Sequence, residues 1–186
     1  FILTLLISLV QLQKQISTPQ LVVRLQTNPS NELAIFSPNG KVVVTTESNT
    51  PKNYLLNLWD ATNGEKLKSF SQETPVHSAA FSPDSRFLVT GGWDGPTNVW
   101  DLVSDKLITE LRHEKQALIS NVYYRSDGRT ILTEDAWGTY LWDSKTGDLL
   151  NQFLSAGYVS KMAYSPITQQ VAIAKTNRDY DHSDLC

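Results

Sequence analysis

The sequence is poor in the residue types on which most catalytic and metal-binding sites depend. Its single cysteine, Cys186, is the last residue, so there is no internal disulfide and no cysteine-based metal site. Three histidines, His77, His113 and His182, lie far apart and show no spacing typical of metal ligands or of a histidine–carboxylate pair. No G-x-S-x-G, P-loop or C-x-x-C motif occurs. We therefore expect no catalytic residue, no metal site and no cofactor.

The chain also lacks a strong charge of either sign. It has 16 Lys and Arg against 19 Asp and Glu, which gives a net charge of −3 and a pI near 5.6. Because nucleic-acid-binding domains present a basic face, we expect no nucleic-acid partner. Hydrophobic residues make up 40% of the sequence and charged residues 19%, as in a folded globular domain. The 186 residues suffice for one domain with a sizeable core.

Long hydrophobic runs are missing except at the amino end. Phe1–Val10 (FILTLLISLV) is too short to span a bilayer, which needs about 20 apolar residues, so we expect no membrane span. The length suits the apolar part of a signal peptide, although no basic segment and no small-residue cleavage site accompany it. An apolar strand or helix packed on a neighbour is the alternative. We expect an exported or periplasmic protein in the first case and a cytoplasmic one in the second. Since the chain starts with Phe1 rather than Met, we also expect a fragment or a processed product.

A repeated pattern occupies most of the remaining chain. Phe81–Asp101 reads as a strand end, a Pro-Asp turn, a second strand, an Asp-Gly turn and a third strand closed by Trp-Asp. Trp-Asp pairs begin at residues 59, 100 and 142, which are 41 and then 42 residues apart. Each pair follows a turn at a matching offset, and a last partial copy opens at Ala163-Tyr164-Ser165-Pro166. A period of about 40–45 residues with a Trp-Asp signature is typical of a propeller blade.

These repeats resemble the WD-repeat (WD40) β-propeller family over roughly Pro19 to Lys175. The resemblance implies an all-β fold, a WD40-type β-propeller with three full four-stranded blades and a partial fourth, so an incomplete or open propeller. An apolar segment (1–18) precedes the blades (19–175), and a polar tail (176–186) follows them. In related propellers a strand placed like Leu21–Leu25 often completes the last blade.

The alternation of apolar residues and the turn residues predict the strands of each unit, and no stretch shows a helical period. Residues 48–53 are expected to lengthen a surface loop of the first unit. The expected strands are Leu33–Phe36, Val42–Thr46, Tyr54–Trp59 and Lys66–Phe70; Val76–Phe81, Phe87–Thr90, Thr97–Trp100 and Lys106–Leu111; Ile119–Tyr124, Thr130–Thr133, Thr139–Trp142 and Asp148–Phe153; and Val159–Tyr164 and Gln170–Ala174.

Three and a half blades do not close a ring. Propellers typically have about 4–8 blades, because closure protects the edges of the sheets. Two accounts follow from the count. The chain is part of a longer propeller, or it forms a homodimer in which two such arcs close one seven-bladed ring.

The resemblance also implies a structural role for several polar residues. In the typical repeat, a histidine before the first strand, a Ser or Thr on the second, a turn Asp and the Trp of the third form a buried hydrogen-bonded chain. In the second unit Thr90, Asp94 and Trp100 occupy three of these places. Gln72 falls at the histidine place, so we expect an altered or incomplete chain there.

The first and third units match the same pattern less completely. The first unit has Thr45 and Trp59, and its inserted residues hide the turn Asp. The third unit has Thr133 and Trp142, while His113 comes two residues before the expected place. We interpret all of these residues as structural.

Two tryptophans outside the Trp-Asp pairs are the candidate binding residues. Trp93 directly precedes the turn Asp, where related propellers meet their partners, and Trp137 falls in or beside the matching loop of the third unit. Trp is enriched at binding hot spots. The alternative is that each ring caps a neighbouring blade.

We expect a non-catalytic WD-repeat scaffold that binds other proteins. One alternative is the sensor or recruiting propeller of a larger bacterial enzyme, caspase-like or kinase-like, because the lead-in Pro19-Gln20-Leu21-Val22-Val23 is similar to that of such proteins. Another is a truncated, non-functional copy, indicated by the missing histidines and blade halves.

Overall fold

The structure is a computed structural model that describes residues 33–50, 53–93, 96–114, 118–154, 158–165, 168 and 170–176. Every regular element in these ranges is a β-strand. These ranges contain no helix with the length and hydropathy of a membrane span. The segments Phe1–Val10 and Leu21–Leu25 lie outside the described residues, as does the tail after Thr176.

The strands form three sheets of four antiparallel strands, each in chain order, and one sheet of two strands. We call them blades one to four. Their strands are β1 (Ala34–Phe36), β2 (Val42–Thr50), β3 (Asn53–Asp60) and β4 (Lys66–Gln72); β5 (Val76–Phe81), β6 (Phe87–Gly92), β7 (Thr97–Asp101) and β8 (Lys106–Leu111); β9 (Asn121–Tyr124), β10 (Thr130–Glu134), β11 (Gly138–Asp143) and β12 (Leu149–Leu154); and β13 (Tyr158–Tyr164) and β14 (Val171–Thr176).

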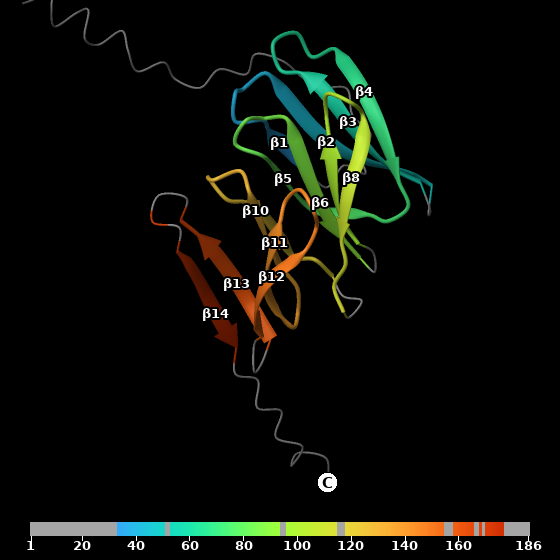
Figure 1. Ribbon diagram of the computed structural model, residues 1–186. Helices are drawn as coiled ribbons and strands as arrows, with labels where there is room; N and C mark the ends of the chain where they lie inside the picture. Colours follow the sequence, from blue (N-terminus) through green and yellow to red (C-terminus); the bar gives the residue numbers. More distant parts are fainter. Residues whose placement is uncertain are drawn as a thin grey trace, which may run out of the picture.

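The blades follow one another in an open arc, with blade one and the two-stranded blade four at its opposite ends (Figure 1). The prediction of an all-β, incomplete propeller with three full blades and a partial fourth is confirmed.

One predicted loop is instead part of a hairpin. Residues 48–53 were expected to form a surface loop, but β2 continues to Thr50 and β3 starts at Asn53. Ser48 pairs with Tyr54, and Thr50 pairs with Asn53 after a register shift. Strand pairing satisfies backbone N–H and C=O groups of these polar residues, so the insertion extends the hairpin.

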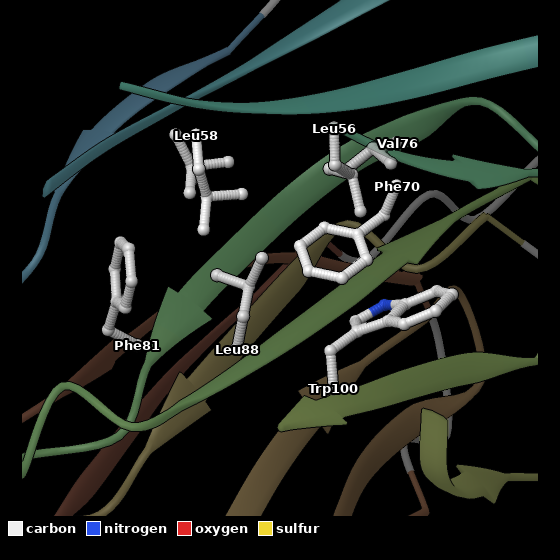
Figure 2. Packing of buried hydrophobic residues seen from close by; sticks show 8 residues of the cluster. Leu56, Leu58, Phe70, Val76, Phe81, Leu88 and Trp100 are labelled. Atoms are coloured by element: carbon white, nitrogen blue, oxygen red, sulfur yellow. The ribbon is translucent and has the colours of Figure 1, made fainter. Parts of the chain in front are cut away.

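The hydrophobic core lies between the blades rather than within them. One buried cluster joins blades one and two, and a second joins blades two and three. Figure 2 shows Leu56, Leu58 and Phe70 of blade one pointing toward Leu88 and Trp100 of blade two. Each fully buried aliphatic or aromatic side chain contributes about 1.5–3 kcal/mol relative to exposure. The full second cluster is Val89, Val99, Leu111, Ile119, Val122, Ile131, Tyr140 and Trp142.

Blade three has an uncovered position where the other blades are sealed. Phe70 and Leu111 lie on the outermost strands of blades one and two and are 8% and 0% exposed. Phe70 packs on the Trp100 ring, with 5.6 Å between centroids. Phe153 lies at the same place in blade three, opposite Thr139, yet it is 50% exposed. Blade four has two strands in the described structure, so no third-strand tryptophan is described that would cover Phe153.

The aspartate of each Trp-Asp pair organises the turn to the outermost strand. The Oδ1 atoms of Asp60, Asp101 and Asp143 accept backbone N–H groups two and three residues further along the chain. This local capping is typical of Asp in turns. In blade two, Asp101 also accepts a 2.8 Å hydrogen bond from Arg86, which together with the backbone N–H groups lowers its pKa well below the usual range.

A β-bulge recurs beside each of these tryptophans. The pairing of the third and fourth strands shifts register between Leu58 and Trp59 in blade one, and at the matching points before Trp100 and Trp142. Three repeats therefore share the same irregularity in the outermost ladder.

Candidate protein-docking face

Blade three links its tryptophan to a threonine and a histidine, and a turn aspartate lies beside the histidine. Trp142 Nε1 donates to Thr133 Oγ1 at 2.8 Å, and Thr133 Oγ1 lies 3.2 Å from His113 Nε2. His113 Nδ1 lies 3.4 Å from Asp135 Oδ2, and these two side chains are 5% and 0% exposed. Since Thr133 Oγ1 already accepts the indole N–H, its own proton is free to go to Nε2, which favours the histidine tautomer protonated on Nδ1.

His113 occupies the histidine place although the sequence put it two residues too early. That expectation counted back from the first strand of blade three. The structure aligns the repeats from the preceding outermost strand instead, because His113 follows Leu111 by two residues, as Gln72 follows Phe70. Seven residues separate His113 from β9, whereas three separate Gln72 from β5, so the additional residues follow the imidazole and do not move it.

Blade two builds the same chain with an amide in place of the imidazole. Trp100 Nε1 donates to Thr90 Oγ1 at 3.1 Å, and Thr90 donates to Gln72 Oε1 at 3.1 Å. Gln72 Nε2 then donates to the carbonyl of Thr74 at 2.7 Å. The chain of hydrogen bonds is continuous through these four residues, with Gln72 at the place of the histidine. Asp94 lies outside the described residues.

Blade one retains the inner half of the pattern and adds polar pairs of its own. Trp59 Nε1 donates to Thr45 Oγ1 at 2.9 Å. Asn57 is fully buried; it donates to Glu47 at 2.8 Å and accepts from Ser69 at 2.6 Å. Such buried polar groups are stabilising only when they are paired.

None of these chains presents a reactive group to solvent. Thr90 and Thr133 are 1% and 0% exposed, and their tryptophans are buried with them. His77 is exposed, but it lies in a bulge of β5 between Val76 and Ser78. In the described ranges no three His, Cys, Asp or Glu side chains converge in a way suited to a metal ion. The hydrogen bonds of these residues join strands within a blade and, through Gln72 and His113, neighbouring blades.

The two candidate binding residues lie at the same end of neighbouring blades. We call this end the Trp face: it is where β2, β4, β6, β8 and β10 finish and the strands that follow them begin. The opposite end, with the Trp-Asp turns, is the turn face. Trp93 is 53% exposed and Trp137 is 44% exposed, whereas the three Trp-Asp tryptophans are buried.

One short segment of blade three joins the loops that carry the two tryptophans. The N–H of Ile119 donates to the carbonyl of Gly92, directly before Trp93, at 2.9 Å. The next residue, Ser120, donates its N–H to the carbonyl of Glu134 at 2.8 Å, at the base of the Trp137 loop. The two loops are therefore anchored to consecutive residues.

Both loops are held firmly at their bases. A Cβ atom on Gly92 would lie 1.6 Å from the carbonyl oxygen of Pro75, so only glycine fits there. In the other loop, Asp135 Oδ1 accepts the N–H groups of Trp137 at 2.7 Å and of Gly138 at 3.0 Å. The backbone at Gly92, directly before Trp93, and at Trp137 itself is thus fixed by these contacts, which lowers the entropic cost of binding.

Buried carboxylates lie beneath this face. Glu134 is 1% exposed and accepts a 2.7 Å hydrogen bond from Asn121; burial raises its pKa, and the neighbouring Asp135 adds to the shift. Burial also raises the pKa of Tyr140 to about 12, and the charges of Asp135 and Glu114 act in the same direction. The carboxylates of Glu134 and Asp135 thus lie close together at this end of the sheets.

The repeats and the fanned four-stranded sheets define a β-propeller repeat protein. A family model described as WD domain, G-beta repeat, matches residues 64–101. The chain is similar to the serine-threonine kinase receptor-associated protein of Gallus gallus, with 29% identity over 65% of this chain and 35% of that protein. It is also similar to periodic tryptophan protein 2 of Arabidopsis thaliana (29% identity; 61% of this chain and 12% of that protein) and to mitotic checkpoint protein bub-3 of Caenorhabditis elegans (41%; 29% and 16%).

The repeats are similar to those of the WD-repeat (WD40) family, whose model matches one of them. The chain spans about a third of the length of the Gallus gallus relative. The three relatives named come from animals and a plant, so they give no support to the hypothesis of a propeller fused to a bacterial enzyme.

Proposed function

We propose that the chain is a non-catalytic scaffold that binds another protein through its Trp face. The observation on which this depends is the exposure of Trp93 and Trp137 on two neighbouring, well-anchored loops. Large aromatic side chains held in rigid loops are typical binding hot spots, because they bury much area at little entropic cost. Names such as receptor-associated protein, among the relatives, agree with a role in protein assemblies.

The alternative is that each ring caps a neighbouring blade. The half-exposed rings argue against this, since a capping tryptophan would be covered like Trp59 or Trp142. Trp93→Ala should therefore leave the melting temperature nearly unchanged. A fall of many degrees would make Trp93 a core residue and remove the basis of the proposal.

The direct test compares variants in affinity capture from extracts of the source cells. Trp93→Ala and Trp137→Ala should lose partners that the unmodified chain retains. Ile108→Ala is the matched control, because Ile108 is also apolar and 42% exposed but lies on the outermost strand β8, away from the loops. Equal capture by all variants would contradict the proposal.

Ring closure by a second copy remains a separate proposal. The half-exposed Phe153 is a surface that closure would bury. Sedimentation equilibrium measures the mass of the protein in solution. A dimer that becomes a monomer in the Phe153→Ser variant supports ring closure, and a monomer at all concentrations contradicts it.

A further inference from the structure

In the part of the chain that the structure describes, charged side chains are distributed unevenly between the two ends of the sheets. Among the described side chains, the Trp face has six carboxylates and one guanidinium, that of Arg112, which pairs with one of the six. The turn face and the strand ends next to it have eight carboxylates and eight Lys or Arg side chains. The six carboxylates are those of Glu47, Glu73, Glu110, Glu114, Glu134 and Asp135.

The acidic groups closest to solvent lie in the loops next to the tryptophans. Glu73 follows β4 in the loop to blade two, and Glu114 follows β8 in the loop to blade three; both are exposed. Glu73 is two residues before Pro75, whose carbonyl touches the Trp93 loop at Gly92. Glu114 is next to His113, which contacts Asp135 of the Trp137 loop. Each exposed ring thus has a carboxylate on a neighbouring loop.

An indole face beside a carboxylate is a favourable site for a cation. The ring quadrupole attracts an ammonium or guanidinium group above it, and Trp is the best of the aromatic residues for this. Arginine gains most, since its planar guanidinium stacks on the ring and pairs with a carboxylate at the same time. A phosphate-rich or acidic ligand would be repelled by the same charges.

Building on the proposed function, we propose that the Trp face binds an arginine-rich segment of a partner protein. Guanidinium groups stack on Trp93 and Trp137 and pair with Glu73 and Glu114. The buried charges of Glu134 and Asp135 strengthen the attraction without direct contact. The segment follows the line of the Ile119–Ser120 anchor between the two loops.

The test uses a synthetic peptide of alternating arginine and serine, with lysine–serine and glutamate–serine peptides of equal length as controls. Isothermal titration and tryptophan fluorescence should show tightest binding of the arginine peptide, weaker binding of the lysine peptide and none of the glutamate peptide. Trp93→Ala or Trp137→Ala should lower the affinity for the arginine peptide roughly three- to tenfold, the range expected for the loss of one cation–π contact. Trp93→Phe should retain part of the affinity.

The charge contribution is tested with a double variant, Glu73→Gln with Glu114→Gln, which should weaken binding and flatten its dependence on salt concentration. Glu65→Gln is the matched control, since it removes a carboxylate from the turn face. Circular dichroism checks that each variant remains folded.

Two results would overturn the inference: no binding of the arginine peptide, or binding that is insensitive to both tryptophans. Either result leaves the scaffold proposal standing if Trp93→Ala still abolishes partner capture. If capture is also insensitive to Trp93, both proposals fail.

Discussion

His113 Nδ1 and Asp135 Oδ2 face each other at 3.4 Å between blades two and three, with both side chains shielded from solvent. The imidazole also contacts the rings of Tyr140 and Trp142 edge-on, at 4.7 and 5.0 Å between centroids. His113 comes from the end of blade two, and its three partners belong to blade three. This contact therefore joins the two blades.

Substitutions of His113 should show whether a side-chain amide stabilises the contact between blades two and three as well as the imidazole does. His113→Ala leaves a cavity beside Tyr140 and Trp142 and removes the partner of the Thr133 hydroxyl, so we expect a loss of about 3 kcal/mol in the free energy of unfolding. His113→Gln copies the Gln72 arrangement of blade two and should lose about 1 kcal/mol. Urea denaturation measures both. Equal losses would mean that the imidazole itself is required.

Gly92 should be the least replaceable glycine of blade two. Gly92→Ala drives a methyl group into the carbonyl of Pro75, and we expect a loss of about 3 kcal/mol from backbone displacement. Gly40→Ala is the comparison: its Cβ would meet open space, and only the positive φ of 69° opposes it, at about 1 kcal/mol. If thermal unfolding ranks the two in the opposite order, the contact at Pro75 is not rigid.

Ser85 is the residue whose replacement by glycine should stabilise the fold. It has φ of 63° in the first turn of blade two, where blades one and three have Gly40 and Gly128. Ser85→Gly removes about 1 kcal/mol of strain, so the melting temperature should rise. Ser85→Ala also removes the hydroxyl that accepts the Asn39 N–H, but it keeps the strain. A gain in both variants would trace the effect to the hydroxyl instead.

Glu134 should make the protein less stable as pH rises. Because burial raises its pKa above the usual 4.5, the folded state holds the proton more tightly than the unfolded state. The stabilisation that Glu134 contributes to the folded state is therefore fully present below pH 4.5, and it declines as pH rises through the elevated pKa. Glu134→Gln removes this decline, so its stability relative to the unmodified protein should increase from acidic to neutral pH. A pH-independent difference would contradict the assignment.

Asp101 should show the opposite pH dependence. Its pKa is lowered, first by the hydrogen bond from Arg86 and then by the backbone N–H of Val103, so its contribution is present above the usual 3.8 and is lost on acidification. Asp101→Asn should lower the urea midpoint at neutral pH and have progressively less effect as pH falls below 3.8. An effect that grows in acid would exclude this mechanism.

The sequence was a good guide wherever structure depends on neighbouring residues. Strand alternation and turn residues are local signals, and the strands of blade two begin where they were predicted. The hairpin between β2 and β3 was different. Residues 48–53 have the composition of a loop, but pairing between the two strands decides their conformation.

The polar chains and the binding residues depend on contacts between blades, which spacing along the chain does not report. His113 seemed misplaced because a longer loop follows it, and only the offset from Leu111 would have revealed its role. Likewise, Gln72 reads as a missing histidine until its amide is seen beside Thr90. The exposure of Trp93 depends on how the neighbouring blade packs against it, and the sequence alone does not report that packing.

The bulges beside Trp59, Trp100 and Trp142 affect whether another strand can pair with the outermost edge of each full blade. A straight outermost strand would offer a regular row of hydrogen-bonding groups to a strand from another molecule, and apolar residues such as Leu67, Ile108 and Leu150 would favour such stacking. The bulge interrupts that row at the matching residue of every full blade, so a second strand cannot keep a regular hydrogen-bond register along it. We therefore expect the bulges to oppose edge-to-edge stacking of the blades from different molecules.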